Sequence, residues 1–368
     1  MLPARRSRHD RVATTLAALR DDEVAASVRD APTVGGGVGG GCSRADVDGV
    51  PVFVKRVPIT DRELADPYTT ANLFGLPAAW QYGMYRMAGP GFGAWRELAA
   101  NRSVTEGILA GETESFALLH QWQVLPGRPP VAAEHLDIDA AVDQFGGNSA
   151  IRTRFDALVT ATASLALFFE HLTNELPRWL SDPIGRAAMV ERQLFEVVAF
   201  LRHREILHLD GHFANIRADD DRLYLADFGL ATSPRFDLSD AERDFARSNA
   251  NHDADYASMR LVNWLVASVC GVPVSTKGDS VARNLFVQGA RPVTSHRAWR
   301  RTLRRSSPGT PPPLPGGTNS AAACSMATCT SHTLASHALA RAEPPALADL
   351  ATALCMSAQP IGQRQLKG

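Results

Sequence analysis

Apolar and polar residues recur with two different periods along this chain, and the change of period separates predicted helices from predicted strands. Helical spacing predicts five helices: residues 12–28, a segment beginning near Ala94, and residues 151–162, 186–206 and 255–271. The last of these is strongly apolar and is expected to end at Gly271, because glycine commonly terminates helices. A shorter helix is predicted over residues 173–180.

Strand-forming residues cluster in a second set of segments. In "ADVDGVPVFVKRV", Asp48-Gly49 supplies a tight turn between two strands. The segment "SFALLHQWQVLPG" predicts another strand, and the continuously apolar "SLALFFEHL" predicts a buried one. Residues 59–92 are rich in Gly, Pro and Tyr and are long for a loop. We therefore expect them to have structure of their own or to cover a site.

Composition narrows the class of protein. The chain has 368 residues, is 45% hydrophobic and carries a formal net charge of -1, which suits one bilobal enzyme or two domains. The near-neutral charge gives no reason to expect nucleic acid or a membrane as partner. The basic N-terminus lacks an apolar signal core, and no apolar run reaches the ~18 residues of a membrane span. The 5 cysteines show no CxxC spacing, so we expect a cytoplasmic protein without a thiolate metal site.

A glycine-rich stretch stands directly before the predicted hairpin. In "GGGVGGG", Gly37, Gly39 and Gly40 fall in loose phosphate-loop registers, since residues without Cβ let backbone N–H groups approach phosphate oxygens. A flexible linker is the alternative interpretation. The hairpin ends in Lys55, whose ammonium needs a partner if the strand is buried. A phosphate and the carboxylate of Glu97, on the next clear helix, are the expected partners; a solvated edge-strand lysine is the alternative.

The segment "ILHLDGHFANIRADDDRLYLADFGL" concentrates polar side chains around two short strands. A hairpin here brings Asn215 and Asp227 together, and their oxygens suit Mg²⁺, which takes few protein ligands. Asp210 is expected to orient an attacking hydroxyl and accept its proton. Phosphoryl transfer needs these parts: cradled phosphates, a held Mg²⁺ and a positioned nucleophile. A polar surface hairpin is the alternative interpretation.

Taken in order, these features resemble the protein-kinase-like superfamily over residues 33–237. Its glycine loop, strand lysine, helix glutamate, hinge, catalytic loop and Asp-Phe-Gly triplet correspond to "GGGVGGG", Lys55, Glu97, "FFEHL", "HLDGHFAN" and "DFG". The resemblance implies that Asp210 is the catalytic base, that Asn215 and Asp227 bind Mg²⁺, and that Lys55 contacts the α- and β-phosphates of ATP. It also implies a hinge from Glu170 to Leu172 whose backbone meets the adenine.

The chain departs from the family pattern at several positions. Leu209 replaces the arginine that usually precedes the base, and no Ala-Pro-Glu follows the Asp-Phe-Gly triplet. His212 creates an Asp-x-His-x-x-Asn pattern that is similar to small-molecule kinases. Asp253 or Asp255 could brace the catalytic loop, although an ordinary helix cap is the alternative.

The resemblance implies an α+β, bilobal kinase-like fold with an antiparallel N-lobe sheet plus one helix, and a mainly helical C-lobe. We assign residues 1–32 to a helical extension, 33–172 to an N-lobe with an insertion, 173–300 to a C-lobe and 301–368 to a disordered tail. The Pro-, Gly- and Ser-rich start of that tail is typical of GC-rich DNA read out of frame. We hypothesise that a frameshift replaced the native end.

The expected function is ATP- and Mg²⁺-dependent transfer of the γ-phosphoryl group to a hydroxyl, foremost a Ser or Thr of a protein. A small-molecule kinase of the aminoglycoside or choline type is the first alternative, favoured by His212. A catalytically silent pseudokinase scaffold is the second, favoured by the loose glycine loop. The expected partners are ATP and an unidentified protein or small-molecule acceptor.

Overall fold

The computed structural model describes residues 2–37, 40–81, 91–130, 132, 135–176, 180, 183–219, 221–268 and 272. The chain forms two compact units, Met1–Trp179 with Glu196–Asp253, and Leu180–Phe195 with Ala254–Gly368. The first unit contains both β-sheets and the residues of the candidate site. The fold is mixed α+β, as the sequence predicts.

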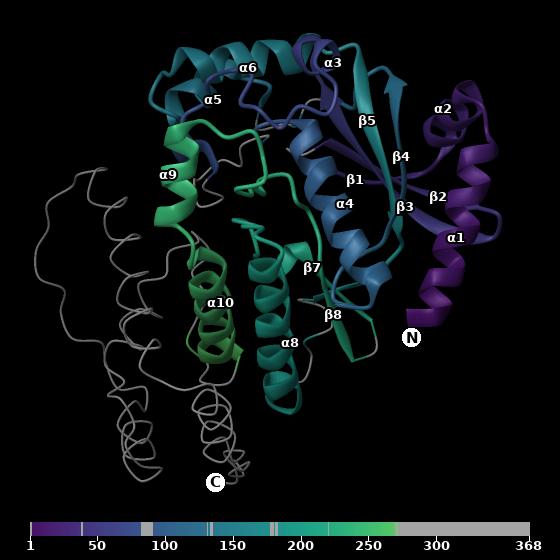
Figure 1. Cartoon of the computed structure of the whole chain (residues 1–368), viewed down its shortest axis with the longest axis vertical. Coiled ribbons are helices and arrows are strands. Elements are labelled where there is room, and N and C mark those ends of the chain that lie inside the picture. The colour runs from purple at the N-terminus through teal and green to yellow at the C-terminus, as the bar shows by residue number, and fades with distance from the viewer. Residues whose placement is uncertain are drawn as a thin grey trace, which may run out of the picture. The chain divides into compact units, whose positions relative to one another are not determined.

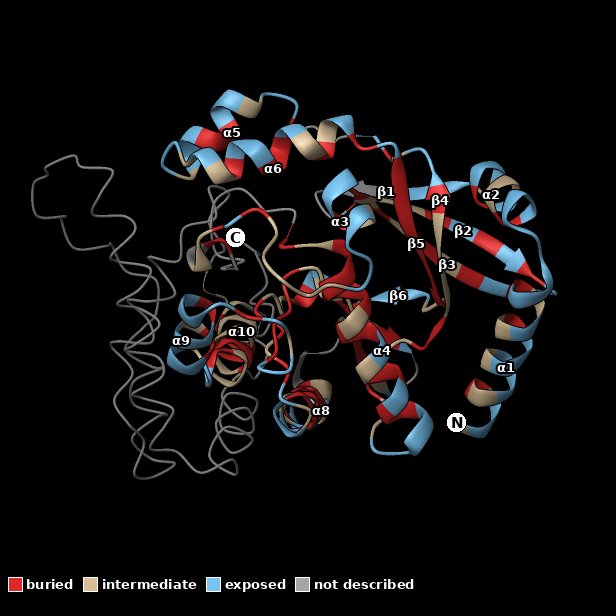
Figure 2. Cartoon of the chain, turned by 45° about the horizontal axis from the view of Figure 1, so that its top comes forward, coloured by how far each residue is buried: buried red, intermediate tan, exposed pale blue. Residues whose placement is uncertain are grey.

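An antiparallel five-stranded sheet organises the first unit, with strand order β1-β2-β3-β5-β4 (Figure 1). Its strands are β1 Thr33–Gly37, β2 Gly40–Val47, β3 Val50–Ile59, β4 Leu119–Pro126 and β5 Ala163–Glu170. Asp48 and Gly49 have φ of 52° and 74° and connect β2 to β3, which confirms the predicted hairpin. The predicted buried strand is β5, which is buried along its whole length (Figure 2).

Helices cover both faces of this sheet. Helices α1 (Leu2–Ala18) and α2 (Asp21–Asp30) pack on one face, and α4 (Ala94–Ala110) packs on the other (Figure 1). The prediction of one helix over residues 12–28 is wrong. Helix α1 begins earlier and ends at Ala18, and a separate helix, α2, begins at Asp21. Glu23 accepts a hydrogen bond from the Arg20 backbone N–H, and three acidic residues in the first turn of α2 favour a new helix start there.

A smaller antiparallel sheet, β6-β7-β8, begins at Asn174, shortly after the end of β5 in the sequence. Its strands are β6 Asn174–Glu175, β7 Ile216–Asp219 and β8 Arg222–Leu225. The predicted helix over residues 173–180 is wrong at its start, because Asn174 and Glu175 pair with β7. The β7–β8 hairpin is the one predicted from the core segment, with Asp219 at its tip.

The remaining elements are mostly helical: α3 Asp61–Ala65, η1 Ala78–Gln81, α5 Ile138–Gln144, α6 Ser149–Thr160, α8 Pro183–His203, η3 Phe213–Asn215, α9 Asp240–Ser248 and α10 His252–Ser268. Residues 59–92 have structure of their own where described, because Phe74 and Trp80 pack with α5 and α6. Helix α9 was not predicted, although Ser239 and Glu242 form a capping box that signals its start.

None of the helices in the described part of the chain is long and apolar enough to span a bilayer. The predictions for Gly39, for Gly271 and for the tail at residues 301–368, including the frameshift hypothesis, fall outside the described residues.

Candidate active site

Two carboxylates from distant parts of the sequence converge on one buried ammonium group. The alternation of β3 places Lys55 on the sheet face that α4 covers, and its Nζ lies 2.7 Å from Glu97 Oε1 and 2.8 Å from Asp227 Oδ1. Lys55 and Glu97 are 7% and 3% exposed, while the Asp227 side chain is 43% exposed. The long sequence separation between Lys55 and Glu97 therefore does not prevent their pairing.

The charges of this triad support one another. Burial alone would lower the pKa of Lys55, but Asp227 and Glu97 together hold that pKa well above its usual value. Burial alone would raise the pKa of Asp227, but the Lys55 ammonium brings it down to about 2. For Glu97, burial dominates and raises the pKa despite Lys55. At neutral pH, Lys55 is charged and Asp227 is ionised.

The β7–β8 hairpin brings Asn215 and Asp227 to the same place. Asn215 directly precedes β7, Asp227 follows β8, and the Ala226 backbone N–H donates to the Asn215 carbonyl at 2.9 Å. Asp227 has a left-handed φ of 66°, and its Oδ1 accepts from the Gly229 backbone N–H at 3.2 Å. A Cβ at Gly229 would lie 3.2 Å from that same oxygen, so this position favours glycine.

Asp210, the predicted catalytic base, is hydrogen-bonded to Asn215 of its own loop. Asn215 Nδ2 donates to Asp210 Oδ2 at 3.1 Å and to the Asp210 carbonyl at 3.0 Å. His212 Nε2 lies 3.6 Å from Asp210 Oδ1. The buried His208 ring packs 4.8 Å from the Phe228 ring, and burial lowers the pKa of His208. His208 Nδ1 accepts from the Asp210 backbone N–H, which leaves Nε2–H to donate to the Ala226 carbonyl.

Asp253 braces this loop, and Asp255 has no such contact among the described interactions. The two Asp253 carboxylate oxygens accept from the backbone N–H groups of His208 and Leu209 at 2.7 and 2.9 Å. Leu209 is 1% exposed and has a left-handed φ of 64°, which is uncommon for leucine. The two hydrogen bonds hold the residues before Asp210 in this conformation.

Replacing Asp253 by alanine should free this loop, because two buried N–H donors lose their acceptor. We expect a loss of about 1–3 kcal/mol in unfolding free energy and faster hydrogen exchange at the His208 and Leu209 amides. Urea denaturation and hydrogen-exchange mass spectrometry measure the two effects. Asp255→Ala is the matched control and should leave the exchange of both amides unchanged. Equal protection in the two variants would contradict the bracing role.

A cleft of about 320 Å³ lies beside the triad. Its apolar lining includes Phe53, Ala117, Phe169 and Leu225, and its polar lining includes Lys55, Glu97, Asn215 and Asp227. Glu170, His171 and Leu172, the predicted hinge, line it as well. A ligand with both a flat apolar part and a charged part matches this lining.

Two polar residues of the cleft lining, Asn215 and Asp227, fit Mg²⁺ in their donor chemistry. Asn215 uses its amide nitrogen to bind Asp210, which leaves its carbonyl oxygen as a metal-ligand atom. Asp227 adds an ionised carboxylate, and both side chains line the same cleft. Within the described residues, no three His, Cys, Asp or Glu side chains form a metal-binding cluster. Two oxygen ligands suit a metal that keeps most of its water.

The glycine-rich stretch forms the ends of two paired strands. Gly37 and Gly40 are directly opposite each other in the β1–β2 pair, and Gly39 falls outside the described residues. Gly40 has φ of 127°, and a Cβ there would lie 1.8 Å from the Arg56 carbonyl oxygen. Gly40 is not among the residues that line the cleft, whereas Val34 and Cys42 of the same strands are. Gly40 is thus required by strand packing.

A buried glutamate that the sequence analysis did not single out holds the start of α4. Glu63 Oε1 accepts from the Ala94 backbone N–H at 2.8 Å, and Arg154 Nη1 donates to Glu63 Oε2 at 2.9 Å. Burial would raise the pKa of Glu63, but Arg154 keeps it below its usual value. The capping box of Thr60 with Glu63 was the available signal. Glu63 thereby helps to place Glu97 in the first turn of α4.

Comparison with known proteins assigns no family to this chain. No protein-family model matches the sequence, and no curated protein matches it significantly.

Proposed function

We propose that this protein is an ATP- and Mg²⁺-dependent phosphotransferase that transfers the γ-phosphoryl group to a hydroxyl. One observation carries the proposal: Lys55, Glu97 and Asp227 meet within 2.8 Å at a cleft that Asn215 also lines. A lysine held between two carboxylates beside oxygen ligands suits the binding of a metal–triphosphate. With this activity we propose the finer fold, a bilobal kinase-like arrangement with the active site beside the hinge.

The residues divide the work of the reaction. Lys55, oriented by Glu97, would bind the phosphates, and Asn215 and Asp227 would hold Mg²⁺. Bound Mg²⁺ would neutralise negative charge on the phosphates. Asp210 would accept the proton of the acceptor hydroxyl as its oxygen bonds to the γ-phosphorus. The bond from that phosphorus to the β–γ bridging oxygen breaks, and its electron pair leaves with ADP.

The acceptor class has two candidates. A Ser or Thr of a protein is the first that we propose, in keeping with the Asp-Phe-Gly triplet. A small-molecule hydroxyl is the second, and the placement of His212 Nε2 3.6 Å from Asp210 Oδ1 favours it, because an imidazole there could help to position a small acceptor. A peptide array and a metabolite panel, each read out by ADP release, separate the two.

A thermal-shift titration with ATP, with and without Mg²⁺, tests the nucleotide site. We expect ATP to stabilise the wild type in a Mg²⁺-dependent way, by about 2.7 kcal/mol at a hundredfold excess over Kd. Asp227→Asn should lose the Mg²⁺-dependent part, because an amide is a weaker metal ligand than a carboxylate. Asp219→Asn makes the same change at the opposite end of the β7–β8 hairpin and should behave like the wild type. A cooperatively melting wild type without any shift would rule out the proposed activity.

A further inference from the structure

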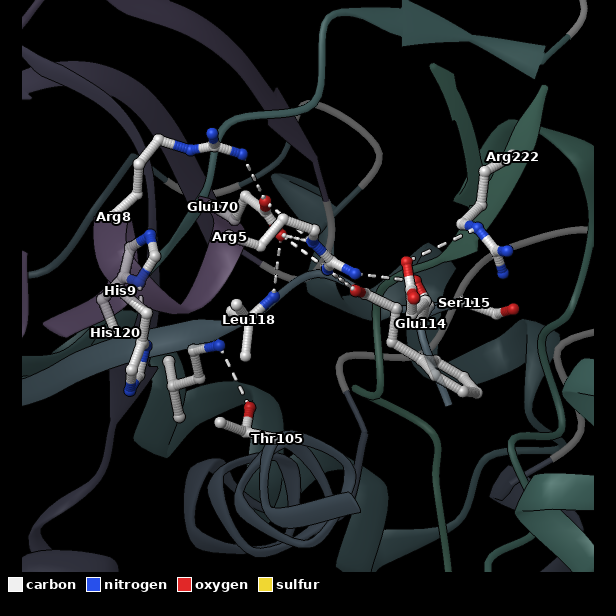
Figure 3. A network of polar contacts seen from close by, with 12 residues as sticks. Arg5, Arg8, His9, Thr105, Glu114, Ser115, Leu118, His120, Glu170 and Arg222 are labelled. Atoms are coloured by element: carbon white, nitrogen blue, oxygen red, sulfur yellow. Dashed lines mark hydrogen bonds and ion pairs between the residues drawn. The ribbon is translucent and has the colours of Figure 1, made fainter. Parts of the chain in front are cut away.

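The hinge glutamate turns its side chain away from the cleft. Glu170 is the last residue of β5, and the alternation of that strand directs its carboxylate toward the face covered by α1 (Figure 3). Its backbone continues into His171 and Leu172, which line the cleft. The side chain is 9% exposed, so its charge needs a partner inside the protein.

Arg5 of α1 supplies that partner. Its Nε lies 3.0 and 3.1 Å from the two Glu170 carboxylate oxygens, and its Nη2 lies 2.7 Å from Oε2. Burial would raise the pKa of Glu170, but hydrogen bonds from Arg5 hold it below its usual value. Arg8 approaches Oε1 at 3.5 Å from a side chain that is 46% exposed, so it contributes less.

The same guanidinium also binds the chain segment that precedes β4. Arg5 Nη1 and Nη2 donate to the carbonyls of Glu114 and Phe116 at 2.9 and 2.6 Å (Figure 3). Phe116 forms a β-bridge with Leu225, which is two residues before Asp227. One side chain, 3% exposed, therefore connects Glu170 to the segment that bridges to the end of β8, just before Asp227.

We propose that Arg5, from the N-terminal helix outside the sheet, is a positioning residue for the nucleotide site. It acts through Glu170 on the hinge backbone that faces the cleft, and this inference rests on the proposed function. Because a buried arginine with its hydrogen bonds made to one carboxylate and two carbonyls has little freedom, it holds the two segments in a single relative position. Loss of Arg5 leaves the buried Glu170 carboxylate with one long hydrogen bond from the Leu118 backbone N–H, at 3.4 Å, and with the half-exposed Arg8 at 3.5 Å.

The proposal predicts a loss that depends on the nucleobase. We expect Arg5→Ala to weaken Mg²⁺·ATP binding about tenfold, a change of about 1.4 kcal/mol. Binding of Mg²⁺·tripolyphosphate should change little, since that ligand has no base to contact the hinge. A purely structural role for Arg5 predicts equal weakening of both ligands, or a lower melting temperature with unchanged affinities.

Calorimetric titrations of the full chain, well below the melting temperature of each variant, decide the question. Arg6→Ala is the matched control: Arg6 lies on the same helix and donates to the Leu109 carbonyl at 2.7 Å, away from the hinge. It should leave both affinities unchanged. Arg5→Lys keeps the positive charge but loses the planar guanidinium. It should weaken ATP binding less than Arg5→Ala does, and it replaces Arg5→Ala in the titrations if that variant does not fold.

The outcomes separate this inference from the function on which it rests. ATP binding by the wild type together with selective loss in the Arg5 variants supports both. ATP binding that is equal in the wild type and the folded Arg5 variants, or an equal loss of both ligands, overturns the role of Arg5 alone. A folded wild type that binds neither ligand overturns the proposed function and the positioning role together.

Discussion

Asp210→Asn is expected to lower phosphoryl transfer about a thousandfold and to leave ATP binding nearly intact. An amide cannot accept the proton of the acceptor hydroxyl, and general-base catalysis contributes roughly 10²–10⁴-fold to such rates. In the wild type, Asn215 Nδ2 donates to Asp210 Oδ2 at 3.1 Å. The amide oxygen of the variant can still accept this hydrogen bond, so the loop should keep its conformation. Asp210 also does not line the cleft in which we propose that the nucleotide binds.

The measurement is ADP release in the presence of a peptide array and of a metabolite panel, paired with the ATP thermal shift on the same samples. Asp219→Asn, an equal change at the exposed hairpin tip, is the control and should retain full turnover. A wild type that binds ATP without releasing ADP for any acceptor would favour the pseudokinase scaffold. Unchanged turnover in Asp210→Asn would remove Asp210 from the reaction.

The largest effect on stability is expected for Lys55→Met. The substitution keeps most of the apolar stem but removes the only charge that separates Glu97 from Asp227 in the described triad. Breaking a buried ion pair costs about 3–5 kcal/mol when the partner charge is left behind. Because the Asp227 side chain is 43% exposed and water can screen it, we expect about 3 kcal/mol, the low end of that range.

The sign of the pH dependence distinguishes this loss from a simple packing defect. In the wild type, the pKa of Asp227 is lowered to about 2, so its contribution is present above about pH 4 and is lost as the pH falls through 2. In Lys55→Met, burial and repulsion raise the pKa of both carboxylates, so acid neutralises them and relieves the repulsion. The stability gap to the wild type should therefore be smaller at pH 5 than at pH 7.

Urea denaturation at the two pH values measures this gap. The double variant Lys55→Met/Glu97→Gln leaves a single, partly exposed carboxylate and should recover much of the loss. A gap that is equal at both pH values, with no recovery in the double variant, would show that the lost contacts of the lysine stem dominate.

Local sequence patterns were sufficient wherever neighbouring residues make the structure. The β2–β3 hairpin follows from Asp48-Gly49, whose left-handed backbone matches the twist of the strands, and α4 starts at Ala94 as predicted. The proximity of Asn215 and Asp227 also follows from local sequence, since they flank the two ends of the short β7–β8 hairpin. The single helix predicted over residues 12–28 shows the limit, because Glu23 accepts from the Arg20 backbone N–H and starts a second helix within a continuous apolar period.

The sequence by itself determined the α+β class and the hairpins, because short-range periodicity and turn chemistry encode them. Only the tertiary structure decided that Glu97 meets Lys55, that Asp253 rather than Asp255 braces the loop before Asp210, and that Arg5 reaches Glu170. Lys55 and Glu97 lie 42 positions apart, and Arg5 and Glu170 lie 165 positions apart. Asp253 lies 45 and 44 positions from His208 and Leu209. Such pairings depend on how the sheet and helices pack, and a charge on a helix carries no local sign of the partner it will meet.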